Sequence, residues 1–151
     1  MSITDRRRML SGKPFFVIFQ ANKVPLNSRY IKSQGENTTV AADKITVKGK
    51  LLINGAVAPK FNEYKTIHIL AKATVINPDW QDPQMRVDNQ TIVSYVSSVY
   101  GTPYITVSGQ TEKEYILDIS STAKGFQFWS MQYQGSNRFS TGEITKIWLE
   151  K

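Results

Sequence analysis

Few residues of this chain could carry chemistry. His68 is the one histidine, and the sequence of 151 residues holds no cysteine. Zinc sites need several nitrogen or sulfur ligands, so these counts argue against zinc and against a cysteine nucleophile. A Ser-His-Asp triad would have to use His68, and the sequence contains no Gly-x-Ser-x-Gly motif to supply its nucleophile. We therefore predict an ordinary surface or partly packed histidine, no catalytic residue, no metal and no cofactor.

Carboxylates gather in one segment, residues 77–89, which contains Asp79, Asp82 and Asp88 together with two prolines. Calcium takes six to eight oxygen ligands, but this spacing matches no EF-hand loop. Asn-Pro and Asp-Pro turn chemistry explains the same residues better. A glycosidase pair is a weaker reading, since such carboxylates normally project from the strands of a cleft. The segment is predicted to be the chain's long irregular loop.

Three aromatic residues, Trp80, Tyr100 and Tyr104, lie in or beside predicted loops. Together they could form a platform for a sugar ring. They could equally sit in a subunit interface, where Trp and Tyr are enriched. The sequence favours the interface and leaves the sugar site open.

Positive charge is concentrated at the start of the chain. Residues 1–13 carry a net charge of +3, mostly from Arg6, Arg7 and Arg8, which leaves +4 of the total +7 for the rest. In the rest, lysines alternate with acidic and apolar residues, whereas a nucleic-acid groove needs clustered cations beside exposed aromatics. The sequence thus predicts a basic arm over residues 1–13, one domain over residues 14–151, and no nucleic-acid partner. No apolar run approaches the roughly 20 residues of a membrane span, so no membrane partner is expected.

Strand patterns fill the domain. The clearest is Tyr64–Ile76, in which Ile67, Ile69, Ala71 and Ala73 share one face. In residues 44–48, Ile45 and Val47 likewise alternate with polar residues. Asn54-Gly55 is a strong hairpin signal. Further strands are expected at residues 14–20, 29–32, 38–42, 51–53, 91–99, 104–107, 115–119, 126–133 and 144–149. Such short, closely spaced strands predict an all-β antiparallel β-sandwich of the jelly-roll type.

The C-terminal third contains the densest aromatic cluster, including Phe126, Phe128, Trp129 and Trp148. Strands 126–133 and 144–149 are apolar on both faces, and a lone sandwich would leave one of those faces wet. This pattern predicts a further layer or a second chain over them.

Two resemblances follow from these motifs. The pattern Glu114–Ile119, Gly125–Phe128 and Thr141–Leu149 resembles the last strands of jelly-roll carbohydrate-binding modules. The opening Asp5–Leu10 resembles the start of small structural proteins of bacteriophages of gut bacteria, which serve as head-fibre, tail-fibre or baseplate components.

Combined, these features predict a non-enzymatic virion protein that oligomerises through its sandwich. Its partners would be other virion proteins, to which Arg6, Arg7 and Arg8 anchor it. The alternative is a carbohydrate-binding module that recognises a glycan through Trp80, Tyr100 and Tyr104.

Overall fold

The computed structural model describes residues 15–54, 63–75, 84–90, 104–119, 125–130 and 140–151. Within these ranges the chain forms eleven strands and one short 3-10 helix, η1 (Ser28–Tyr30). The strands are β1 (Phe15–Gln20), β2 (Ile31–Gln34), β3 (Thr39–Val40), β4 (Ile45–Val47), β5 (Lys50–Asn54), β6 (Thr66–Val75), β7 (Gln84–Gln90), β8 (Tyr104–Ser108), β9 (Lys113–Asp118), β10 (Gly125–Ser130) and β11 (Ser140–Glu150). No helix of the described residues is long and apolar enough to cross a membrane.

The strands form two antiparallel sheets. The six-stranded sheet has the order β3-β4-β11-β6-β9, and β1 also pairs with β11. The five-stranded sheet has the order β2-β5-β10-β7-β8. From β4 to β7 and again from β8 to β11, each strand lies in the opposite sheet from the one before it. This crossing between layers is the sandwich, jelly-roll arrangement that the sequence predicted.

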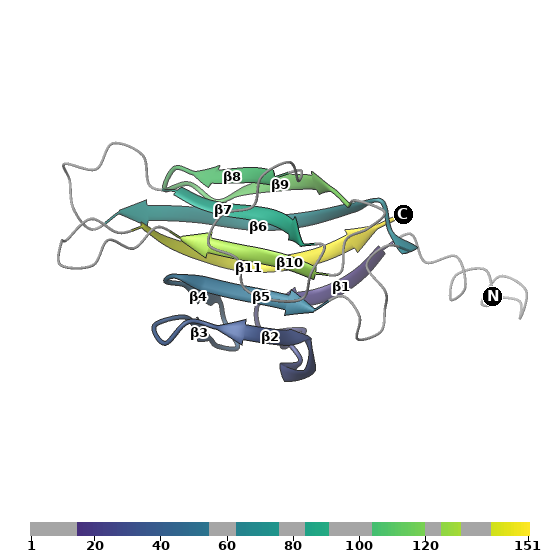
Figure 1. The fold of residues 1–151 in the computed structure, drawn as a ribbon, viewed down its shortest axis with the longest axis horizontal. Coiled ribbons are helices and arrows are strands. Elements are labelled where there is room, and N and C mark those ends of the chain that lie inside the picture. Colours follow the sequence, from purple (N-terminus) through teal and green to yellow (C-terminus); the bar gives the residue numbers. More distant parts are fainter. Residues whose placement is uncertain (1–14, 55–62, 76–83, 91–103, 120–124, 131–139) are drawn as a thin grey trace, which may run out of the picture.

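Strands β6 and β11 run side by side along the length of the molecule (Figure 1) and supply much of the core. Ile67, Ile69, Ala71 and Ala73 of β6 are fully buried, as their alternation predicted. The register of β11 against β6 shifts between Ile144 and Lys146, so Thr145 is an extra residue on β11. This β-bulge lets Ile144, Ile147 and Leu149 all face inward, although their spacing is not a strict period of two.

The five-stranded sheet closes the core from the other side. Phe126 and Phe128 of β10 pair in register with Ile53 and Leu51 of β5, and all four side chains are fully buried. Residues in register share one face of a sheet, so these four form a continuous apolar layer. Ile45 and Val47 of β4 are also fully buried, as the sequence predicted.

A corner between the sheets is fixed by one buried hydroxyl. Ser130 at the end of β10 is fully buried; its Oγ donates to the carbonyl oxygen of Val47 at 2.9 Å and accepts from the backbone N–H of Gly49 at 2.9 Å. Gly49 has a φ of 95°, a left-handed conformation that glycine adopts without a steric penalty. The chain thus passes from β4 in one sheet to β5 in the other through Gly49, which the Ser130 hydroxyl of β10 holds in place.

Three local predictions were wrong. Asn54-Gly55 does not join a hairpin, because β5 and β6 belong to different sheets. Residues 84–89 are not loop: they lie in β7, between β10 and β8, where Met85 and Val87 alternate with polar residues along a strand. The short strand expected at residues 29–32 begins later, at Ile31, because η1 occupies Ser28–Tyr30. The strand expected at 91–99 lies outside the described residues.

Candidate functional site

Most residues that the sequence singled out lie outside the part of the chain that the structure describes. This holds for Arg6, Arg7 and Arg8, for Trp80 and Tyr100, and for the two aspartates of residues 79–82. Tyr104 begins β8 and is in register with Asp88 of β7. The structure therefore places one predicted aromatic residue and one predicted carboxylate on adjacent strands of the five-stranded sheet.

The outer face of the five-stranded sheet carries two register rows that include polar and aromatic residues. Successive residues of a strand point to opposite faces, and Phe126 and Phe128 belong to the core, so positions 127 and 129 belong to the outer face. Following the pairing across four strands gives one row of Lys50, Trp129, Arg86 and Thr106, and a second row of Leu52, Gln127, Asp88 and Tyr104. Four adjacent strands span about 14 Å, so each row is a compact line across the sheet.

Two residues at the centre of this outer face are buried. Leu52 is 0% exposed and Gln127 is 1% exposed, although both alternate with core residues. Leu52 is also absent from the apolar cluster that fills the space between the sheets. Both side chains are therefore covered. The further layer or second chain that the sequence predicted over strands 126–133 and 144–149 stays a prediction.

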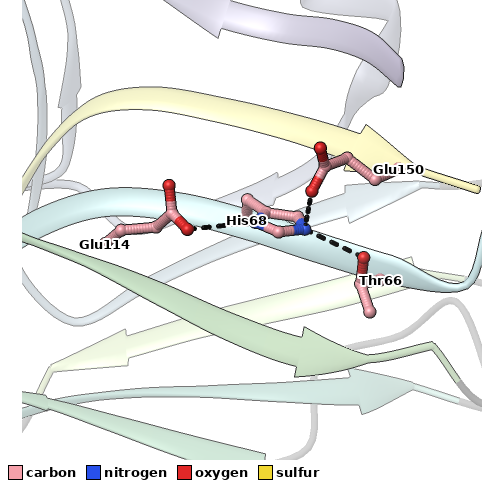
Figure 2. Close-up of polar contacts among 4 residues, drawn as sticks. All are labelled: Thr66, His68, Glu114 and Glu150. Carbon is pink, nitrogen blue, oxygen red and sulfur yellow. Dashed lines mark hydrogen bonds and ion pairs between the residues drawn. The ribbon is translucent and has the colours of Figure 1, made fainter. Parts of the chain in front are cut away.

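The outer face of the six-stranded sheet carries the histidine. His68 lies in β6, in register with Trp148 on β11, and its ring stacks on the indole with centroids 5.0 Å apart. Figure 2 shows Glu114 and Glu150 on either side of the ring: Nδ1 lies 3.4 Å from Glu114 Oε2, and Nε2 contacts Glu150 Oε2. The Thr66 hydroxyl is 2.9 Å from Nε2. His68 is 7% exposed, so it is buried more deeply than the surface or partly packed histidine that the sequence predicted.

This cluster has the residue types of a hydroxyl-imidazole-carboxylate set, but its geometry does not favour catalysis. The imidazole nitrogen that faces the Thr66 hydroxyl also faces the Glu150 carboxylate, which needs a proton on that nitrogen. A general base would have to leave the same nitrogen unprotonated. The side chain of His68 is only 9% exposed, so a substrate has little access to it. Across the described residues, no three His, Cys, Asp or Glu side chains are grouped to hold a metal ion.

A second polar cluster on the six-stranded sheet surrounds Glu143 of β11. Its carboxylate accepts from Lys44 Nζ at 2.9 Å and lies 3.5 Å from Lys72 Nζ. The hydrogen bond from Lys44 holds the pKa of Glu143 below its usual value, against the opposing effect of partial burial. The same contact raises the pKa of Lys44. These groups line an open cavity of about 290 Å³ whose ion pairs are satisfied within the chain.

Comparison with known proteins gives a fold and no sequence family. No family model and no curated protein matches the sequence. Three solved structures are similar over nearly the whole chain. A point mutant of the module CBM29-2 has a TM-score of 0.53 at 12% identity, covering 89% of this chain and 90% of its own. A second CBM29-2 mutant, complexed with mannohexaose, has a TM-score of 0.55 at 13% identity, covering 89% of each chain.

The third structure is CBM29_1, a family 29 carbohydrate-binding module from Piromyces equi. It has a TM-score of 0.54 at 13% identity, covering 91% of this chain and 90% of its own. All three are carbohydrate-binding modules, and the similarity covers 89 to 91% of this chain. The jelly-roll fold that the C-terminal motifs suggested is therefore the fold of this chain.

Proposed function

We propose that this protein is a non-catalytic carbohydrate-binding module that binds a glycan chain on the outer face of its five-stranded sheet. This is the alternative of the two functions that the sequence suggested. The similar solved structures are carbohydrate-binding modules, one of them complexed with mannohexaose, and they lend no support to a virion role. The fold alone does not assign a function, so the proposal depends on the residues of the outer face.

The observation that carries the proposal is the row through Trp129. A pyranose ring has an apolar face, which an aromatic side chain can cover, and a rim of hydroxyl groups, which need donors and acceptors. In the register, the position of Trp129 is directly between those of Lys50 and Arg86, and the neighbouring row adds Asp88. Arg and Lys donate, and ionised Asp accepts. One aromatic position flanked by residues of this chemistry suits a neutral hexose chain.

The neighbouring row extends the surface to Tyr104, which the sequence left open as a sugar contact or an interface residue. Its register partner is Asp88, two residues from Arg86 on the same strand and therefore on the same face. Trp80 and Tyr100 remain predictions for the same glycan.

Calorimetric titration with mannohexaose and with cellohexaose tests the proposal. The matched variants are Trp129→Ala and Trp148→Ala, which remove the same side chain from the outer faces of the two sheets. We expect Trp129→Ala to raise the Kd roughly 30-fold, or about 2 kcal/mol, as loss of a central aromatic contact commonly does. Trp148→Ala should leave the Kd within about twofold, once thermal melting has confirmed that each variant is folded.

Two results would contradict the proposal. The first is absence of binding to both hexasaccharides by the wild-type protein. The second is an equal loss of affinity in the two tryptophan variants, which would move the glycan away from the row through Trp129.

A further inference from the structure

The two anionic clusters on the outer face of the six-stranded sheet differ in their counter-charges. Glu143 is shared by two lysines. Glu114 and Glu150 have side chains 45% and 41% exposed, and within the described residues their only ion-pair partner is the imidazole of His68. The nearest cation along β11, Lys146, lies over the ring of Trp148 with its Nζ 4.6 Å from the centroid. The cluster around His68 therefore has two carboxylates and no Lys or Arg partner from these parts of the chain.

Exposed apolar side chains border the same cluster. Among the described residues, Ile116 at 51% and Phe15 at 45% are the exposed large hydrophobic side chains. The register puts Ile116 next to His68, and Phe15 next to Glu150. A surface that combines carboxylates with exposed apolar groups suits a segment that carries both arginines and apolar residues.

Residues 1–14 have that composition and join the body at this surface. They contain Arg6, Arg7 and Arg8 together with Ile3, Met9 and Leu10, and they lead directly into Phe15. Fourteen residues reach roughly 45 Å when extended, whereas the strands β1, β11, β6 and β9 together span about 14 Å. Gly12 and Pro14 are residue types that favour a turn just before β1. The segment is thus long enough to turn back and cross the sheet to Glu114.

We propose that residues 1–13 dock on the outer face of the six-stranded sheet of their own chain. Arginines of the Arg6–Arg8 run form charge-assisted hydrogen bonds with Glu114 and Glu150, since the guanidinium matches a carboxylate bidentately. Met9 and Leu10 cover the exposed apolar groups beside His68. The arm then lies on the face opposite the proposed glycan surface. The arginines anchor it to its own chain.

Paramagnetic relaxation enhancement in the full-length protein tests this docking. The chain has no cysteine, so Thr4→Cys gives a single site for a nitroxide label next to the arginines. We expect the strongest line broadening at the amides of residues 113–118 and 146–150. It should be weaker in β5 and β10, which lie in the other sheet about 10 Å further away.

Charge variants of the labelled protein separate docking from chance proximity. Changing Arg6, Arg7 and Arg8 to alanine should abolish the excess broadening, as should Glu114→Gln combined with Glu150→Gln. The matched controls are Lys23→Ala with Lys32→Ala and Glu36→Gln with Glu63→Gln, which remove exposed charges elsewhere and should change nothing. Glu114→Gln alone, at an exposed side chain, gives a partial loss even if the double variant fails to fold.

Three outcomes would overturn the proposal. One is broadening strongest in the five-stranded sheet, and another is broadening that survives the arginine replacement. The third is broadening of an isotope-labelled protein only when it is mixed with a spin-labelled second copy, which would make the docking intermolecular.

Discussion

The outer faces of the two sheets use their polar residues in different ways. On the six-stranded sheet, charged groups contact one another: Glu143 binds Lys44 and Lys72, and His68 lies between Glu114 and Glu150. On the five-stranded sheet, Lys50, Trp129 and Arg86 line up in register across three strands, beside the buried Gln127. The first arrangement pairs charges within the sheet, whereas the second places an aromatic position between two basic positions.

The two outer faces also differ in burial. At the centre of the five-stranded face Leu52 and Gln127 are at most 1% exposed, whereas the six-stranded face leaves Ile116 half exposed at β9. An exposed apolar side chain on a sheet face suits a peptide segment. One sandwich can therefore offer two separate surfaces, because each sheet contributes only one of its faces to the shared core.

Removing a core side chain should destabilise both sheets, and it is the change with the largest expected effect on the free energy of unfolding. Phe128 is fully buried beside Leu51, so Phe128→Ala removes its burial and leaves a cavity. We expect a loss of about 3–5 kcal/mol in the free energy of unfolding, measured by urea denaturation. Lys32→Ala is the control, because Lys32 is exposed on β2 and its truncation should cost about 0.5 kcal/mol or less. Equal losses in the two variants would contradict the described core.

The Ser130 hydroxyl connects the two sheets, so removing it should lower the free energy of unfolding, by less than the loss of the Phe128 side chain does. Ser130→Ala leaves the carbonyl of Val47 and the N–H of Gly49 without the side-chain partner they now have. Leaving buried groups unpaired costs about 1–3 kcal/mol, which urea denaturation would measure. Ser28→Ala, at an exposed residue of η1, should be nearly neutral. A neutral Ser130→Ala would mean that the corner does not depend on this hydroxyl.

Sequence alone predicted the elements whose signal is local. Apolar residues recur at every second position of β6 and β4, so Ile67, Ile69, Ile45 and Val47 could be assigned to the core from their spacing. The β-rich pattern and short spacing then indicated a sandwich. These predictions succeeded because a strand with one buried face repeats every two residues, whatever its neighbours are.

The wrong predictions concerned features that depend on strand pairing between residues distant in the sequence. Asn54-Gly55 has the residues of a hairpin turn, but turn chemistry does not specify which sheet the next strand joins. β7 was missed because prolines and aspartates precede it, although Met85 and Val87 give a short alternation that could have revealed it. The row through Trp129 depends on register between residues more than forty positions apart, and no local pattern contains that register.

A pH titration gives the smallest effect and tests the claim that the charges of the six-stranded face stabilise the fold. The hydrogen bond from Lys44 lowers the pKa of Glu143 below its ordinary value of 4.5. An acid with a depressed folded-state pKa stabilises the protein above its unfolded pKa, and this contribution is lost as the pH falls through the folded value. Glu143→Gln should therefore flatten the dependence of unfolding free energy on pH below about 4.5, measured by urea denaturation at several pH values.

The effect should be small because Lys44 is exposed to solvent, and it should shrink further at high salt. Glu36→Gln removes one exposed carboxylate between β2 and β3, where no lysine contact comparable to that of Glu143 is found among the described residues. That variant should keep the wild-type slope. If Glu143→Gln also keeps it, the ion pairs contribute no stability. The six-stranded face would then be distinguished by its exposed apolar groups and its histidine cluster, and its ion pairs would be surface contacts without a role in stability.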